Sequence, residues 1–367
     1  MPAAALAAPV SSREVLGIWL RHLCALLFPL NALVFLLTGP HSGWWPLAFV
    51  LPLAVAHYWD THGGVELRQP RAELPALRFD ALLLLLAALQ VLNVTLLARY
   101  WSIQGFWTWD SLVGILVIGA NSGYSGIVVA HELIHRKPKW ARLLGRLLMC
   151  TVVYEHFYTE HLRGHHARVG TAEDPATARY GETFMHFYIR TVPAQFRSAW
   201  RLETQRLGDV NMRAWDPRQL RNRVVHGLVF EWGIAWVILA TCGGAALAIF
   251  LLQALFASRA LEVVNYFEHW GLLRQGTRIQ PVDSWDTTSW FTYYGLTGLT
   301  RHADHHAHAS RPYQQLRIWA ESPKLPRGYI GLFPLVLGRN KKFQKLMTEE
   351  LKRCKLGPFL EESSVEA

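Results

Sequence analysis

Long apolar runs are the feature that most constrains how this chain can fold. Six of them approach the roughly 20 residues that a helix needs to cross the hydrocarbon core of a bilayer. One contains an unbroken leucine stretch, Leu82–Leu86, which is hard to reconcile with a helix of a soluble protein. The runs cover residues 15–37, 44–59, 81–97, 112–130, 224–240 and 245–267. The sequence therefore predicts an all-α integral membrane protein with six transmembrane helices, against the alternative of a large soluble helical protein.

The basic residues are distributed unevenly about these runs. The chain has 37 Lys and Arg residues and a net charge of +10, yet residues 38–43, 101–110 and 241–244, which would connect the runs on one side, contain none. Because cytoplasmic loops carry the excess of Lys and Arg, this asymmetry places both termini in the cytoplasm. The positive charge then serves topology and attraction to anionic lipid, so no nucleic acid partner is expected. A landing site for an acidic protein is a further interpretation.

We expect one membrane-embedded domain over residues 1–367, with residues 341–367 as a C-terminal cytoplasmic tail. The four cysteines are far apart and form no Cys-x-x-Cys pair, which argues against a cysteine-rich iron carrier within the chain.

Nine of the 17 histidines fall into clusters at the cytoplasmic ends of the predicted spans. Histidines four residues apart share one face of a helix, so their rings can reach one ion. One ion takes roughly four to six ligands, and nine imidazoles therefore suit two ions better than one. The nine are His131, His135, His161, His165, His166, His269, His302, His305 and His306.

Each cluster also contains an acidic residue. These are Glu132, Glu160, Glu268 and Asp304. They could bind metal directly, but we favour a role as acceptors for the outer ring N–H, which orients the ligand. Spacing does not identify the metal, since imidazole suits zinc, copper, iron and nickel. A membrane zinc protease, for which His-Glu-x-x-His is the signature, and a metal transporter are alternatives.

Four signatures in order resemble those of the integral-membrane non-haem di-iron alkane monooxygenases (alkane 1-hydroxylases), within the membrane fatty acid desaturase/hydroxylase superfamily. The resemblance extends to about residue 340. The signatures read His131-Glu-Leu-Ile-His135, Glu160-His161-Leu-Arg-Gly-His165-His166, Asn265-Tyr-Phe-Glu-His-Trp-Gly-Leu272 and Arg301-His-Ala-Asp-His-His306.

This resemblance implies two iron ions held by the nine histidines, O₂ as co-substrate, and conversion of a medium- or long-chain alkane to a primary alcohol. It implies electrons from NAD(P)H, which reach the site indirectly through a reductase and a rubredoxin-like carrier. Because the chain lacks the carrier's cysteines, the carrier is expected to be a separate protein. The expected location is the bacterial inner membrane, with a hydrophobic substrate entering from the lipid.

The substrate is the least determined part of this expectation. Trp270 replaces the tyrosine usual in the fourth signature, and the segment 272–284 is short. Hydroxylation of aryl-methyl, terpene or fatty-acyl groups, or lipid desaturation, is the alternative; three residues between His161 and His165, where desaturases usually have two, favour hydroxylation. Small residues of the fourth run could line a substrate channel together with Trp270, or could allow close helix packing. They are Gly119, Ala120 and Gly123.

Overall fold

The computed structural model describes residues 11–70 and 74–360, and within these ranges its regular structure is helical. The β-type pairings among these residues are two isolated bridges, Val65 with Ser289 and Asp286 with Lys324. The main helices are α1 (Ser12–His22), α2 (Leu27–Thr38), α3 (Leu51–His62), α4 (Ala76–Ile103), α5 (Trp109–Asn121), α6 (Val129–Ile134), α7 (Lys139–Cys150), α8 (Phe157–Glu160), α9 (His166–Arg168), α10 (Phe184–Arg206), α11 (Arg223–His269), α12 (Trp290–Gly295), α13 (His302–Ala307), α14 (Tyr329–Gly338) and α15 (Asn340–Cys354). The predicted all-α membrane class is confirmed.

Four helical stretches are long and apolar enough to cross a membrane. They are Ser12–Thr38, Ala76–Ile103, Trp109–Ile134 and Arg223–His269. The predicted count of six is not confirmed. Residues 44–59 form a 3₁₀-helix, η2 (Trp45–Val50), followed by the 12-residue α3, which is short for a span. The fifth and sixth predicted runs both lie within α11, whose helical backbone is interrupted at Gly243.

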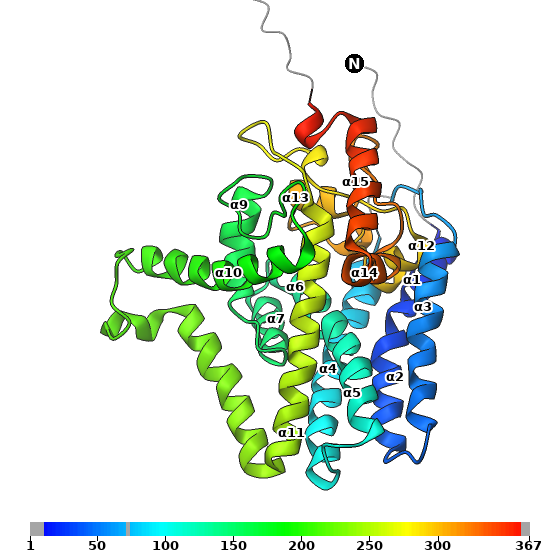
Figure 1. The fold of residues 1–367 in the computed structure, drawn as a ribbon, viewed down its shortest axis with the longest axis vertical. Coiled ribbons are helices and arrows are strands. Elements are labelled where there is room, and N and C mark those ends of the chain that lie inside the picture. The colour runs from blue at the N-terminus through cyan, green and yellow to red at the C-terminus, as the bar shows by residue number, and fades with distance from the viewer. Residues whose placement is uncertain (1–10, 71–73, 361–367) are drawn as a thin grey trace, which may run out of the picture.

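Helix α11 folds back on itself. Figure 1 shows two arms that meet at the lower end of the molecule, and the backbone break is at Gly243, with φ +85° and ψ 178°. Glycine adopts this left-handed φ without a steric penalty. The first arm, residues 223–242, exposes Phe230, Trp232 and Trp236, as expected of a helix in lipid. The second arm, residues 244–269, packs against α4 and α5 and carries His269 at its end.

The two ends of the bundle differ in chemistry. The turns at the lower end in Figure 1 are those without Lys or Arg, and they expose Trp44, Trp45 and Trp107 as an interfacial aromatic belt would. Trp101, in contrast, is buried, and its indole N–H donates to Ser111 Oγ at 2.9 Å. The upper end holds the short helices and loops that carry the histidines.

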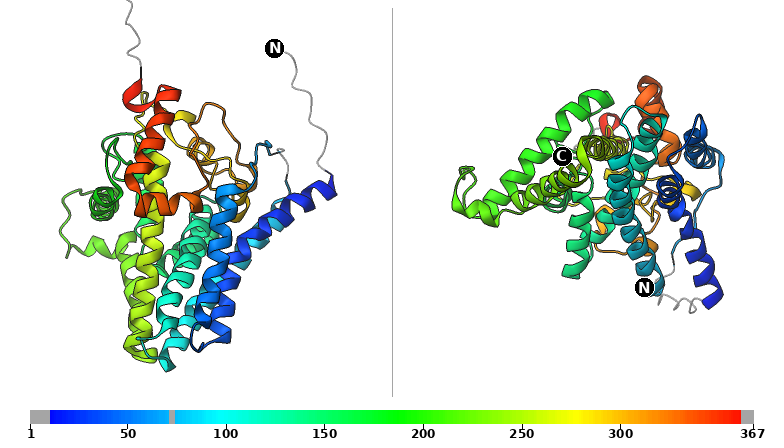
Figure 2. Two further views of the ribbon diagram at one scale, coloured as in Figure 1. Left: turned by 45° about the vertical axis from the view of Figure 1, so that its right-hand side comes forward. Right: turned by 90° about the horizontal axis from the view of Figure 1, so that it is seen from below.

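The predicted C-terminal tail is partly a packed helix. α15 buries Phe343, Met347 and Leu351 completely, and the Phe343 ring lies 5.3 Å from the ring of Tyr266 in α11. α15 therefore covers the upper end of the bundle, as Figure 2 also shows. Residues 361–367 of the predicted tail lie outside the described residues.

Candidate metal centre

The nine clustered histidines come together at the upper end of the bundle, although they are up to 175 positions apart in the chain. Their ring nitrogens form two groups, and within each group the atoms lie within 4.8 Å of one another. The five-histidine cluster is His131, His135, His161, His166 and His305. The four-histidine cluster is His165, His269, His302 and His306. The predicted convergence on two sites is therefore present in the structure.

A π-helix divides the second histidine signature between the two clusters. Residues His161–His165 form η4, in which the backbone turn is wider than in an α-helix. The wider turn brings His161 and His166, five residues apart, into contact, with their Nε2 atoms separated by 3.0 Å. His165 consequently points to the other cluster. His161 and His165 are four residues apart but do not reach one ion site as expected for an α-helix, because spacing alone does not reveal a π turn.

Gly164 lies within this turn, close to the side chains of Glu160 and Arg168. A Cβ at this position would lie 2.4 Å from Glu160 Oε1 and 2.5 Å from an Arg168 guanidinium nitrogen. Arg168 donates to that same carboxylate at 2.8 Å, so a larger residue at position 164 would displace an ion pair that holds the helix.

The ring nitrogens of the five-histidine cluster face one another closely. The Nε2 atom of His161 lies 3.0 Å from Nε2 of His135 as well as from that of His166, and Nε2 of His166 lies 3.2 Å from that of His305. A ring nitrogen carries at most one proton, so Nε2 of His161 cannot form a hydrogen bond to both neighbouring Nε2 atoms as their donor. With imidazole–metal bonds of about 2.0–2.1 Å, adjacent ligands at a right angle would lie about 2.9 Å apart. The spacing therefore matches the edges of a coordination polyhedron.

The four-histidine cluster has the same geometry. Nε2 of His302 lies 3.2 Å from that of His269 and 2.9 Å from that of His306. Nε2 of His165 is buried and has no hydrogen-bond partner among the described residues. An unpaired acceptor inside a polar cluster is costly unless something binds it, so this atom also fits a cation.

The two clusters are adjacent. The rings of His166 in the first and His306 in the second have centroids 4.6 Å apart. Burial lowers the pKa of both histidines well below its usual value, and neighbouring imidazoles lower it further. The same holds for His161, His302 and His305. These rings are therefore uncharged at neutral pH, which is the form that binds metal.

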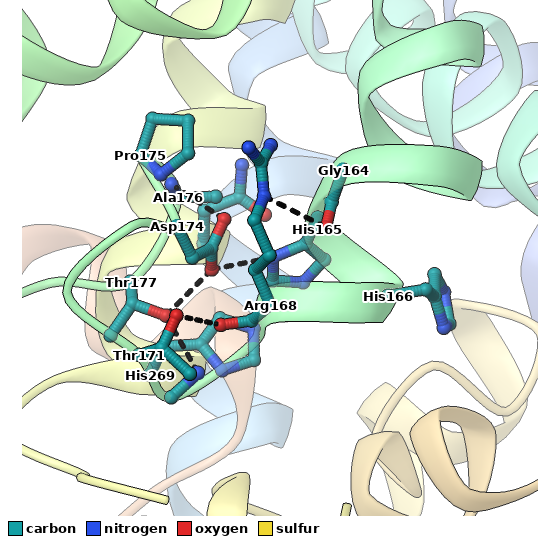
Figure 3. Close-up of polar contacts among 12 residues, drawn as sticks. Gly164, His165, His166, Arg168, Thr171, Asp174, Pro175, Ala176, Thr177 and His269 are labelled. Atoms are coloured by element: carbon teal, nitrogen blue, oxygen red, sulfur yellow. Dashed lines mark hydrogen bonds and ion pairs between the residues drawn. The ribbon is translucent and has the colours of Figure 1, made fainter. Parts of the chain in front are cut away.

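Asp174 supports the four-histidine cluster from outside. Its Oδ2 atom accepts a hydrogen bond from His165 Nδ1 at 2.9 Å and another from Thr177 Oγ1 at 2.6 Å (Figure 3). Burial would raise the pKa of Asp174, but His165 and the hydrogen bonds hold it below its usual value. The carboxylate fixes the tautomer of His165 and leaves Nε2 free to point at the cluster. Asp174 was not predicted as a site residue, because it follows His165 by nine residues and lies in a loop.

Of the four acids that the sequence analysis did select, Glu268 lies closest to a clustered ring. Its Oε2 atom is 3.3 Å from Nε2 of His302, the same atom that faces His269, while its Oε1 atom accepts a hydrogen bond from Tyr329 at 2.5 Å. This carboxylate therefore reaches the inner side of the four-histidine cluster, where it could act as a further metal donor.

The other three selected acids bind arginine among the described residues. Glu132 pairs with Arg136, Glu160 with Arg168, and Asp304 with Arg311. Each pair ties a histidine-bearing element to a charged side chain nearby. These contacts position the elements, and an orienting role toward the rings themselves stays a prediction for these residues.

The predicted channel residues lie against other helices. A Cβ on Gly119 would meet the Phe256 side chain at 2.7 Å, whereas one on Gly123 would find Ala260 at 3.5 Å. Both glycines thus face the second arm of α11, as the helix-packing alternative requires; Ala120 beside them is half-buried. Trp270 is buried, and its indole N–H donates to the Glu182 carbonyl at 3.1 Å.

Histidines outside the two clusters have other surroundings. His22 is buried among aromatic rings, with Tyr294 at 4.9 Å and Tyr313 at 5.1 Å between centroids. His41 forms a pair with Asp110 at 2.8 Å, at the opposite end of the bundle. Neither belongs to the two histidine clusters.

Comparison with known proteins agrees with this architecture. The fatty acid desaturase family model matches residues 104–335, which include all nine histidines. Alkane 1-monooxygenase 1 of Pseudomonas aeruginosa is 35% identical over 334 residues, 87% of this chain and 86% of the relative. Alkane 1-monooxygenase 1 of Alcanivorax borkumensis is 32% identical over 329 residues, 85% of this chain and 80% of the relative. The xylene/toluene monooxygenase hydroxylase component XylM of Pseudomonas putida is 25% identical over 228 residues, 60% of each chain.

The helical membrane fold, the two adjacent histidine clusters and these relatives together define the class of protein. The chain belongs to the fatty acid desaturase family and, within it, to the alkane 1-monooxygenases, and it is therefore an oxidoreductase of the monooxygenase type.

Proposed function

We propose that this protein hydroxylates the terminal methyl group of medium- or long-chain alkanes at a di-iron centre. The observation that carries the proposal is the pair of adjacent histidine clusters in a chain related over most of its length to alkane 1-monooxygenases. In the balanced reaction, one atom of O₂ enters the alcohol and the other leaves as water, with two electrons and two protons consumed.

The nine histidines would hold two iron ions, five around one and four around the other, with Glu268 beside the second. Bound there, iron would supply the oxygen-derived oxidant that takes hydrogen from the methyl group and returns a hydroxyl to carbon. Asp174 holds the His165 ring in place, and Tyr329 holds the Glu268 carboxylate. α15 packs beside the end of α11 that carries His269, with the Phe343 ring near those of Tyr266 and Trp270.

Electrons would come from NAD(P)H through a reductase and a separate rubredoxin-like carrier. We further propose that the histidine end faces the cytoplasm of a bacterial inner membrane. The helix α1 begins, and α15 lies, at this same end of the molecule (Figure 1), and the turns at the other end contain no Lys or Arg. Both termini would then be cytoplasmic.

An aryl-methyl substrate is the second candidate, and the XylM relative is the observation that favours it. Its lower identity and shorter coverage place it behind an alkane.

Product analysis distinguishes these candidates. Octane, hexadecane and p-xylene would be fed separately to a host that supplies rubredoxin and its reductase and expresses the protein. We expect primary alcohols from the alkanes. Alcohol from p-xylene alone would favour the aryl-methyl alternative, and an alkene formed from a fatty-acyl chain would identify a desaturase.

Replacement of a clustered histidine provides the matched control. His269→Ala should abolish product formation, because His269 is buried in the four-histidine cluster. His186→Ala should leave it unchanged, because His186 is exposed on α10 and belongs to neither cluster. Activity retained by His269→Ala would remove this residue from the proposed site.

A further inference from the structure

A groove lined by arginines lies beside the metal centre and has no role in the reaction proposed above. It is enclosed by α10 and by the loop of residues 168–179, and its volume is about 490 Å³. Five arginines line it, against a single carboxylate, Glu173. The arginines are Arg168, Arg179, Arg190, Arg197 and Arg201.

Two of these arginines are structural. Arg168 binds Glu160 and Ser198, each at 2.8 Å, and Arg190 binds both carboxylate oxygens of Glu182, at 2.8 and 2.9 Å. They hold the loop and α10 together and form the back of the groove.

Arg197 and Arg201 differ from this pair. Both are exposed, and neither side chain makes a hydrogen bond or an ion pair with any residue in the ranges 11–70 and 74–360. They share one face of α10 with Arg190, because positions i, i+7 and i+11 of a helix lie nearly above one another. Two guanidinium groups without carboxylate partners therefore point along one side of a groove that has room for an anion.

The placement of α10 indicates where that anion comes from. Figure 1 shows α10 lying across the direction of the bundle, and its C-terminal end leads through residues 207–222 to the start of the first arm of α11. That arm exposes apolar side chains from its first turns onward, including Val229 and Phe230. Met185 and Ile189 of α10 are likewise 49% and 65% exposed. The helix thus lies at the height of the lipid headgroups, with an apolar side and an arginine side.

We propose that this groove binds the phosphate of an anionic phospholipid headgroup, through Arg197 and Arg201. The guanidinium group presents paired N–H donors whose geometry matches phosphate oxygens, and basic residues near the membrane surface attract anionic lipid. The groove also shares its loop with the metal centre: Pro175, which lines it, follows Asp174, and the Pro175 carbonyl accepts hydrogen bonds from Arg190 and Thr191. A bound headgroup would therefore brace the loop that holds Asp174 against His165.

The test compares three full-length proteins in nanodiscs of phosphatidylcholine with and without phosphatidylglycerol. They are the wild type, the double variant Arg197→Gln/Arg201→Gln, and the control Arg278→Gln/Lys341→Gln. The control removes the same charge from exposed residues outside the groove, on the same end of the molecule. Retained lipid is measured by native mass spectrometry, and the thermal unfolding temperature is measured in each membrane.

We expect wild type and control to retain phosphatidylglycerol, and the groove variant to bind it at least about tenfold more weakly, since each lost bond is charge-assisted. Phosphatidylglycerol should raise the unfolding temperature of wild type and control but not that of the groove variant. Unfolding in phosphatidylcholine alone should be the same for all three, because the substituted side chains have no described partners.

Equal retention of phosphatidylglycerol by all three proteins would overturn the proposal. So would full displacement of the lipid by inorganic phosphate at equal concentration, which would identify free phosphate as the ligand. Binding of an acidic protein that depends on Arg197 and Arg201, with lipid retention unchanged, would assign the groove to a protein partner instead.

Discussion

Asp174→Asn is the substitution whose outcome the geometry specifies most fully. The Asp174 carboxylate accepts from three donors: His165 Nδ1 at 2.9 Å, Thr177 Oγ1 at 2.6 Å and the Ala176 backbone N–H at 3.2 Å. Asparagine has the same shape but replaces one oxygen by an NH₂ group. In either orientation of the amide, a donor then faces a donor, and the charge that strengthened the bond to His165 is lost.

We expect the substitution to weaken the binding of one metal ion. Groups that orient a metal-binding histidine typically contribute tenfold to a hundredfold in metal affinity, or about 1.4–2.8 kcal/mol. Asp174 touches only the four-histidine cluster, through His165. We therefore expect Asp174→Asn to weaken binding at that cluster by this amount and to leave the five-histidine cluster loaded.

The assay is iron content per chain after equilibration with chelators of increasing strength. Wild type should lose its two ions only to the strongest chelators. Asp174→Asn should lose one of its two ions to weaker chelators and keep the other. Glu173→Gln is the control, because that neighbouring carboxylate is exposed and contacts no clustered histidine. Parallel loss of both ions in Asp174→Asn, or a curve identical to wild type, would refute the assigned role.

Further outcomes follow from the packing and from the division of the histidines. Gly119→Ala should destabilise the protein by about 1–3 kcal/mol, because the new methyl group would overlap Phe256, while Gly123→Ala should be tolerated; denaturant unfolding in detergent measures both. His305→Ala and His306→Ala should each lose one ion, but from different clusters, so that their iron spectra differ; identical spectra would contradict the division. Removal of metal by a chelator should lower the thermal unfolding temperature, since the clustered ring nitrogens would then lose their common partner.

The sequence predicted which residues form the site better than it predicted how they are arranged. Charge asymmetry placed His131 and His302 at the same end of the bundle, and the structure brings them there, because a helix that spans a bilayer fixes the height of the residues at its ends. The distribution of His161 and His165 over two clusters could not be predicted, because it depends on a π turn that the spacing of the histidines does not reveal.

Long-range contacts account for the other differences. Asp174 meets His165 only after the chain has turned back through a loop, and no helical spacing links the two. The count of six spans is not confirmed at residues 44–59, where the 3₁₀-helix η2 is followed by the short helix α3 in an apolar run that composition alone presents as one helix.

The most direct test of the central claim is the origin of the product's oxygen. Purified protein loaded with iron, together with rubredoxin, its reductase and NADH, would receive octane under isotopically labelled dioxygen. The account predicts a primary alcohol that carries one labelled oxygen atom, and no such product from His269→Ala. An alcohol that takes its oxygen from water, or an octane molecule that stays unchanged while the iron-loaded protein accepts electrons from rubredoxin, would contradict it.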